Sequence, residues 1–329
     1  MAEIAVAAWP AVSSPGAGLE SAPSTPRQHC LDLDDYSRAE IEQVLETAAA
    51  MQEILARPIK RTPALRGRTV VNCFYEPSTR TRVSFEIAAK NLSADVVTFS
   101  SGGSSVEKGE SLIDTARTLV ALGADVLVMR HHLAGAPYVV ARSAGAHVVN
   151  AGDGSHAHPT QALLDLYTLR HRLGDLSGKT IGIVGDVLHS RVARSNVHGL
   201  TRLGAQVVLC GPATLLPHCS TLPGVTLEHH LDRLLPHLDA VMPLRIQKER
   251  ASAGLIPSLR EYRREYGMTL ERLERLPAGA VVLHPGPMNE GVEIDPEVAR
   301  SARSAIEEQV TNGVAVRMAV LYLLAGGAQ

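Results

Sequence analysis

A short polar stretch that follows an apolar run has the residue types of a phosphate-binding site. Residues 69–75, Thr-Val-Val-Asn-Cys-Phe-Tyr, predict a buried strand, and a helical pattern begins at Thr79. Ser78 stands at the expected N-cap of that helix, and Thr79 and Thr81 add hydroxyl groups. Because a helix N-terminus offers free N–H groups and Arg80 adds a planar cation, the stretch could hold a phosphate group. A capped helix with solvated arginines explains Ser-Thr-Arg-Thr-Arg about equally well.

A histidine and a glutamine open a second predicted helix. His158 and Gln161 are three residues apart at its start, so both side chains can face one site. A neutral imidazole can donate a hydrogen bond to a carbonyl oxygen that gains negative charge during attack. Arg130 ends a predicted strand at the carboxyl edge where the phosphate stretch also lies, and parallel sheets bind their ligands at that edge. A lone histidine would more often be structural.

Three further segments carry charges or sharp turns. Residues 104–110, Ser-Ser-Val-Glu-Lys-Gly-Glu, could fold over an anion, although a solvated loop is favoured by about three to one for this motif alone. Residues 244–250, Leu-Arg-Ile-Gln-Lys-Glu-Arg, would most often be a solvated helix start, but a second substrate carboxylate would call for a cation such as Arg245. Residues 284–289, His-Pro-Gly-Pro-Met-Asn, end a predicted strand in a rigid turn.

The turn at Gly185 looks at first like a dinucleotide-binding turn. The G-x-G-x-x-G fingerprint is absent, because Gly182 and Gly185 have no third glycine at the helix start. No serine or cysteine stands in a nucleophile context, and the sequence contains no pattern of metal ligands. We therefore expect no nicotinamide or other cofactor, and no metal.

Apolar strands alternate with helices in both halves of the chain. This pattern predicts an α/β fold with two doubly wound domains, each a parallel sheet with helices on both faces, and an active site in the cleft between them. The predicted strands are residues 69–75, 95–99, 124–130, 147–150, 180–186, 206–210, 240–244 and 281–284. The expected domains are residues 28–159, residues 160–311, and residues 312–329, a C-terminal helix that returns to the first domain.

Two of the predicted helices have details that a structure can test. The helix that begins at Thr79 is expected to place Val83, Ile87, Ala88 and Leu92 on its apolar side and to pair Arg82 with Glu86. Residues 299–325 are expected to be helical, with an interruption near Asn312 and Gly313.

Length and composition exclude several classes of protein. A chain of 329 residues has room for two domains. Its net charge of −2 and 3% aromatic content give no reason to expect nucleic acid or a membrane as a partner. Four scattered cysteines suit a reducing compartment, so a cytoplasmic protein is expected. Residues 1–27 lack the basic start of a secretory signal and predict a disordered extension.

The motifs resemble those of the aspartate and ornithine carbamoyltransferases over roughly residues 30–325. Residues 76–82 are similar to the family's carbamoyl-phosphate signature, and His-Pro-Thr-Gln at 158–161 is similar to its carbamoyl-binding motif. Arg-x-Gln-x-Glu-Arg at 245–250 resembles the aspartate-specific members, and the Pro-Gly-Pro turn stands where ornithine enzymes have a cysteine-bearing loop. The resemblance implies transfer of a carbamoyl group from carbamoyl phosphate to L-aspartate, giving N-carbamoyl-L-aspartate and phosphate, in de novo pyrimidine biosynthesis.

The resemblance also implies roles for the residues that match family motifs. It assigns carbamoyl phosphate to Ser78, Thr79, Arg80, Thr81, Arg130, His158, Gln161, Gly286 and Pro287, with Arg80, Thr81, Arg130 and His158 as catalytic residues, and aspartate to Lys108, Arg191, Arg245 and Gln247. Ser104 and Lys108 are implied to enter the neighbouring subunit's site, in a homotrimer. Whether trimers join regulatory chains or a dihydroorotase is left open. The alternatives are a carbamoyltransferase for another amino acid such as ornithine, and a non-catalytic scaffold subunit.

Overall fold

The computed structural model describes residues 27–100, 110–217, 224–246 and 254–326. The predicted N-terminal extension therefore lies outside the described residues, except for Arg27. The guanidinium of Arg27 forms ion pairs with Asp35 and Glu40 and stacks 3.8 Å from the centre of the Tyr36 ring. None of the helices in the described ranges combines the length and the apolar character that crossing a membrane requires.

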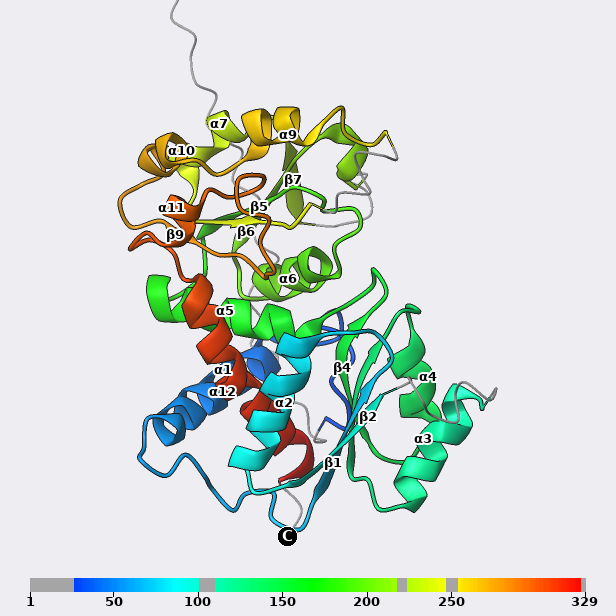
Figure 1. The fold of residues 1–329 in the computed structure, drawn as a ribbon. Coiled ribbons are helices and arrows are strands. Elements are labelled where there is room, and N and C mark those ends of the chain that lie inside the picture. Colours follow the sequence, from blue (N-terminus) through cyan, green and yellow to red (C-terminus); the bar gives the residue numbers. More distant parts are fainter. Residues whose placement is uncertain (1–26, 101–109, 218–223, 247–253, 327–329) are drawn as a thin grey trace, which may run out of the picture.

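The first half of the chain forms a four-stranded parallel sheet with the order β2-β1-β3-β4 (Figure 1). Its strands are β1 (Thr69–Phe74), β2 (Asp95–Ser100), β3 (Val126–His131) and β4 (His147–Asp153). Its helices are α1 (Arg38–Leu55), α2 (Thr79–Asn91), α3 (Leu112–Ala121) and α4 (Ala136–Ser143). Val70 packs in the core on the α1 and α2 side, and its neighbour Val71 packs in the core against α3 and α4. Both faces of this sheet are covered, as predicted.

The second half forms a five-stranded parallel sheet with the order β7-β6-β5-β8-β9. Its strands are β5 (Thr180–Val184), β6 (Gln206–Cys210), β7 (Val225–Glu228), β8 (Ala240–Pro243) and β9 (Val281–Val282). Around it lie α6 (Arg191–Arg202), α7 (Leu231–Leu234), α9 (Leu259–Tyr266), α10 (Leu270–Arg275), α11 (Pro296–Ala299) and two 3₁₀ turns, η2 (Ala213–Leu215) and η4 (Leu235–His237). The sequence reasoning did not predict β7, α7, α9 or α10. These elements are short, with four residues in β7 and in α7, six in α10 and eight in α9, so each offers only a brief pattern to read.

Two helices join the domains. Helix α5 (Pro159–Leu173) lies between the two sheets in Figure 1, and every residue from Pro159 to Leu169 is buried. Helix α12 (Ile306–Ala325) packs against α1, α2 and α5, so the C-terminal helix returns to the first domain. Because α5 contributes to one continuous core with both sheets, the domains share their hydrophobic interior.

The predicted course of the C-terminal helix was wrong in two respects. Helix α12 runs without interruption through Asn312 and Gly313. Gly313 is required for packing, because a Cβ atom there would lie 2.5 Å from Nη1 of the buried Arg317. Residues 300–305 are not helical, because backbone hydrogen bonds of 2.9 and 2.8 Å join Val282 to Arg303 and Ala305 and hold this segment beside β9.

The predicted apolar side of α2 was right for Ala88 and Leu92, which are buried, and wrong for Val83 and Ile87. Val83 and Ile87 are 40% and 43% exposed, whereas the buried side is formed by Thr81, Ser84, Phe85, Ala88 and Ala89. The expected Arg82–Glu86 pair is replaced by Glu86–Lys90 at 2.6 Å. A glutamate four residues before a lysine is the orientation that a helix favours.

Replacement of Gly313 by alanine should lower the free energy of unfolding by about 1–3 kcal/mol, because the added methyl group displaces Arg317 and lies 3.1 Å from Leu164. Chemical denaturation followed by circular dichroism measures this change. Gly279→Ala is the matched control, since no atom lies within 4 Å of its added Cβ. Equal stability of the two variants would contradict the packing role of Gly313.

Candidate functional site

The N-terminus of α2 has the free groups that the sequence predicts for an anion site. Ser78 stands at the N-cap with extended backbone, but its side chain makes no capping hydrogen bond. In α1, by contrast, Ser37 accepts a hydrogen bond from the N–H of Glu40 and so occupies the first turn. The first turn of α2 also contains no acidic residue. Its N–H groups and the Ser78 hydroxyl are therefore available to an anion.

Arg80 joins this helix to the second domain. Its Nη1 donates a hydrogen bond to the Pro285 carbonyl at 3.1 Å, in the Pro-Gly-Pro turn after β9. Gly286 has a φ of +60°, and a Cβ atom there would overlap the Arg80 guanidinium. Burial lowers the pKa of Arg80 from its ordinary value. The structure thus brings together the predicted residues Arg80, Gly286 and Pro287 from distant parts of the chain.

Glu76 links two more of the predicted residues. One carboxylate oxygen of Glu76 lies 2.5 Å from Nη2 of Arg130 and 2.8 Å from Nη2 of Arg191, and its other oxygen accepts a bond of 3.1 Å from Nη1 of Arg191. Burial would raise the pKa of Glu76, but the hydrogen bonds and charges of the two arginines outweigh it and lower that pKa. Two cations share one carboxylate, so a net positive charge remains for an anionic ligand.

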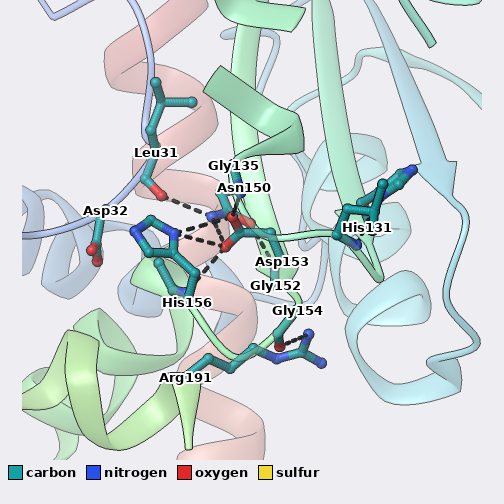
Figure 2. A network of polar contacts seen from close by, with 12 residues as sticks. Leu31, Asp32, His131, Gly135, Asn150, Gly152, Asp153, Gly154, His156 and Arg191 are labelled. Atoms are coloured by element: carbon teal, nitrogen blue, oxygen red, sulfur yellow. Dashed lines mark hydrogen bonds and ion pairs between the residues drawn. The ribbon is translucent and has the colours of Figure 1, made fainter. Parts of the chain in front are cut away.

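Glu76 is the first residue of the predicted phosphate motif, but the sequence indicated no role for it. Its position between a strand end of the first domain and the first residue of α6 could not be predicted, because it depends on how the domains meet. Arg191 is held from a second direction by the Gly154 carbonyl at 3.0 Å (Figure 2). A Cβ atom at Gly152 would lie 3.0 Å from the Arg191 guanidinium carbon, so this close approach depends on glycine.

The loop before α5 is held by a buried carboxylate, Asp153 (Figure 2). Asp153 accepts hydrogen bonds from the Gly135 N–H at 2.7 Å, Asn150 Nδ2 at 2.8 Å and the Ala157 N–H at 3.0 Å, and it lies 3.1 Å from His156 Nδ1. Burial opposes its charge, but these bonds lower its pKa. Four contacts to one carboxylate fix the chain just before His158.

His158 is buried and has an unused ring nitrogen. Its backbone N–H donates to Ser195 Oγ at 3.0 Å, and its Nδ1 has no hydrogen-bond partner among the described residues. Burial, together with the positive charges of Arg130, Arg191 and Arg317, holds its pKa well below the ordinary value. The ring is therefore neutral at physiological pH, and Nδ1 can donate or accept a hydrogen bond with a ligand.

Gln161 lies one turn into α5 and bonds to a residue that the sequence reasoning missed. Its Nε2 donates to Oδ1 of Asp165 at 3.0 Å. Asp165 is fully buried, and burial raises its pKa to about 6 although Asn196, Gln309 and Gln161 all donate hydrogen bonds to it. The i,i+4 spacing of a glutamine and an aspartate on one helix could have predicted this contact.

The other predicted residues are not brought into these contacts. Arg245 is exposed and makes no hydrogen bond or ion pair with any described residue. Ser104, Lys108 and Gln247 lie outside the described residues. Thr81 is buried, and Thr79 is exposed at the helix start.

A hollow of about 610 Å³ lies elsewhere, around α9 and α10 of the second domain, and contains none of the predicted site residues. Its arginines are largely paired, for example Arg272 and Arg275 with Asp232. Within the part of the chain that the structure describes, no three His, Cys, Asp or Glu side chains gather as metal ligands would.

Comparison with protein families gives a match over almost the whole chain. Residues 28–171 match the carbamoyl-phosphate-binding domain of the aspartate/ornithine carbamoyltransferases, and residues 177–324 match the aspartate/ornithine-binding domain of that family.

Individual proteins agree with this match. The aspartate carbamoyltransferase catalytic subunit of Chloroflexus aurantiacus is 63% identical over 304 residues, covering 91% of this chain and 99% of that protein. The catalytic subunit of Moorella thermoacetica is 57% identical, covering 92% and 98%. The crystal structure of Trypanosoma cruzi aspartate transcarbamoylase with carbamoyl aspartate and phosphate has a TM-score of 0.83 at 31% identity and covers 93% of this chain and 99% of that one.

Asp165 should make stability depend on pH in an unusual direction. Its pKa rises from 3.8 to about 6 in the folded protein, so the folded state binds the proton more tightly than the unfolded state does. Its contribution to stability is therefore present at low pH and is lost as the pH rises from about 4 to about 6, by up to ~3 kcal/mol.

Urea denaturation of the wild type and Asp165→Asn at several pH values tests this expectation. The wild type should lose stability relative to the variant as the pH rises through that window, because asparagine does not titrate. All other carboxyl groups are common to both proteins and cancel in the difference. A difference that is constant with pH would contradict the raised pKa of Asp165.

Proposed function

This chain belongs to the aspartate/ornithine carbamoyltransferase family, and we propose that it transfers the carbamoyl group of carbamoyl phosphate to the amino group of L-aspartate. The products are N-carbamoyl-L-aspartate and phosphate, and the reaction belongs to pyrimidine biosynthesis. The observation that carries the proposal is the 3.1 Å contact between Arg80 and the Pro285 carbonyl. This contact places a cation at an uncapped helix N-terminus beside a turn whose carbonyl groups can accept hydrogen bonds from an amino group.

The phosphate group binds at the start of α2. The hydroxyls of Ser78, Thr79 and Thr81, the free N–H groups of the first turn, and the guanidinium of Arg80 supply the hydrogen bonds that a phosphate dianion requires. Arg130 adds a second cation from the end of β3, and Glu76 leaves part of its charge available.

The carbamoyl group lies between His158 and the Pro-Gly-Pro turn. Thr81, Arg130 and the free Nδ1 of the neutral His158 polarise its carbonyl oxygen, which gains negative charge when the carbon is attacked. Gln161 and the backbone carbonyls of Gly286 and Pro287 accept hydrogen bonds from its amino group. Arg80, Thr81, Arg130 and His158 are the catalytic residues in this proposal.

L-Aspartate binds on the side of the second domain. Arg191 at the start of α6 and Arg245 after β8 pair with its two carboxylates, and Gln247 and Lys108 complete the site. The exposed Arg245 has no competing partner among the described residues, so it is available to a substrate.

The reaction requires no covalent enzyme intermediate. The neutral amine of aspartate forms a bond to the carbamoyl carbon, and the carbon–oxygen bond to phosphate breaks with its electron pair remaining on phosphate. The amine nitrogen loses one proton, which the leaving phosphate accepts. The enzyme contributes the positions of the two substrates and the positive charge around the transition state.

The proposed assembly is a cytoplasmic homotrimer in which Ser104 and Lys108 enter the neighbouring subunit's site. Val83 and Ile87 on α2 are 40% and 43% exposed, which supports a subunit contact over this helix. In the proposed division, residues 28–159 bind carbamoyl phosphate, residues 160–311 bind aspartate, and the helix in residues 312–329 returns to the first domain.

Phosphate release from carbamoyl phosphate should depend on L-aspartate and not on L-ornithine, because Arg191 and Arg245 offer two cations to a dicarboxylate. A colorimetric phosphate assay with each amino acid measures this preference. Release with ornithine alone would favour another carbamoyltransferase. A folded trimer that is inactive with both would favour a non-catalytic scaffold subunit.

Lys108→Ala should reduce turnover at least about 100-fold, because it removes a charge that stabilises the transition state. Lys60→Ala is the matched control, since Lys60 is exposed and makes no ion pair with a described residue. Mixing and reassembling Lys108→Ala with Arg80→Ala should restore activity, because a mixed trimer regains a native site when Lys108 acts across the subunit boundary. Absence of any recovery in mixed trimers would contradict the shared site.

A further inference from the structure

We propose that Asp165 is a positioning residue that orients the side-chain amides of Gln161 and Gln309, so that the site for the carbamoyl amino group presents only hydrogen-bond acceptors. The inference rests on the proposed function and deepens it, because it concerns how this site selects carbamoyl phosphate. Asp165 itself touches no substrate in this account. It acts through the two glutamines and has no role in the family resemblance described above.

Three side-chain amides converge on the carboxylate of Asp165. Its Oδ1 accepts hydrogen bonds from Gln161 Nε2 at 3.0 Å and from Gln309 Nε2 at 2.7 Å, and its Oδ2 accepts one from Asn196 Nδ2 at 2.8 Å. Asp165 and Asn196 are fully buried, and Gln309 is 3% exposed. These donors come from α5, α6 and α12, so the carboxylate lies where both domains and the returning helix meet.

The chemistry of a carboxylate determines which way each amide must face. An ionised carboxylate can only accept hydrogen bonds, whereas an amide can donate through nitrogen or accept through oxygen. Asp165 therefore requires Gln161 to present its Nε2, which leaves Oε1 as the free end of the side chain. Gln161 Oε1 accepts no hydrogen bond from any described residue, so it is available to the amino group of a ligand.

The side-chain amide of Gln309 is oriented by Asp165 in the same way, and it bonds to the segment that leads into the Pro-Gly-Pro turn. Because Gln309 Nε2 is used by Asp165, its Oε1 faces the other way and accepts the backbone N–H of His284 at 2.9 Å. His284 Nδ1 in turn accepts the N–H of Gly286 at 2.8 Å. These bonds occupy the N–H groups of the turn, and its carbonyl groups remain as acceptors.

This arrangement allows the site to distinguish carbamoyl phosphate from acetyl phosphate. The amino group of carbamoyl phosphate donates hydrogen bonds to Gln161 Oε1 and to the turn carbonyls. Acetyl phosphate has a methyl group at the same place and leaves these buried acceptors unpaired, which disfavours its binding. Without the fixed carboxylate, Gln161 can rotate its amide, and the discrimination between the two ligands weakens.

The buried positive charge of Arg317 affects which variants of Asp165 can fold. Arg317 is buried, and Asp165 is the anion that most favours its charged form, against a desolvation that lowers its pKa to about 10. Removing Asp165 alone therefore leaves a buried cation without this support. A second variant that removes both charges is needed in case the single variant does not fold.

The test compares Asp165→Leu, which removes both acceptor oxygens, with the wild type by steady-state kinetics with L-aspartate. Three constants are measured: the KM for carbamoyl phosphate, and the inhibition constants of acetyl phosphate and of inorganic phosphate against it. We expect the ratio of the acetyl phosphate inhibition constant to the carbamoyl phosphate KM to fall about tenfold in the variant. The inhibition constant of inorganic phosphate should stay within about twofold, because phosphate binds at α2 and does not contact Gln161.

A double-mutant cycle with Gln161→Met distinguishes orientation from general damage. Gln161→Met should lower the same ratio, and Asp165→Leu should have no further effect on it once Gln161 is absent. Thr168→Ala is the matched structural control, because it removes a buried 3.0 Å hydrogen bond between α5 and α12 without touching either glutamine. The control should lower stability and leave the ratio unchanged.

The outcomes separate a failure of the role of Asp165 from a failure of the proposed function. A folded Asp165→Leu that keeps the wild-type ratio, or additive effects in the cycle, would overturn the role of Asp165. If the single variant does not fold, Asp165→Leu combined with Arg317→Met takes its place and is judged by the same ratio. A wild-type protein that releases no phosphate with aspartate would overturn the proposed function instead, so the two failures are distinguishable.

Discussion

The ion bridge at Glu76 is the interaction on which the arrangement of the site depends. Arg130 at the end of β3 and Arg191 at the start of α6 would repel each other if they were brought together alone. The carboxylate of Glu76 lies within 2.8 Å of both guanidinium groups and makes their approach favourable. All three side chains are largely shielded from water, so their interaction is stronger than that of an exposed pair. The two domains thus meet around a charged group that retains excess positive charge.

Two buried carboxylates, those of Asp153 and Asp165, support this arrangement. Asp153 holds the loop before α5, and Asp165 holds the amides at the junction of α5, α6 and α12. Each buried carboxylate receives several hydrogen bonds, which offset the cost of removing its charge from water. Burial raises the pKa of both carboxyl groups. At Asp153 the hydrogen bonds from His156, Asn150 and Gly135 outweigh it, whereas burial dominates at Asp165. The site residues are therefore held by groups that never need to contact a substrate.

Much of the candidate site could be predicted from local sequence. Ser78, Arg80, His158 and Gln161 lie at the starts of helices, where spacing and capping residues predict free N–H groups and side chains on one face. Glu76, Asp165 and Arg317 were missed as functional residues. The roles of Glu76 and Arg317 depend on partners 115 and 233 positions away in the chain, and no local pattern contains that information. Asp165 has one local partner, Gln161, but its bond to Gln309 spans 144 positions. Arg317 stands among apolar residues of α12, and this position was the one local indication that it has a role.

The sequence by itself determined the fold class, the parallel strands and the chemical nature of the site, because these depend on apolar periodicity and on short motifs. Only the tertiary structure decided which face of α2 is buried and whether α12 is continuous. Val83 and Ile87 satisfy a helical apolar pattern, yet the buried side of α2 is the one that Arg317 contacts through Ser84. Gly313 predicts a break in isolation, but its missing side chain gives the Arg317 guanidinium its place. At α2 the core accepts the side that carries Phe85, Ala88 and Leu92, and at α12 the missing Cβ atom of Gly313 leaves room for Arg317. Both outcomes depend on packing partners far along the chain, which no local pattern contains.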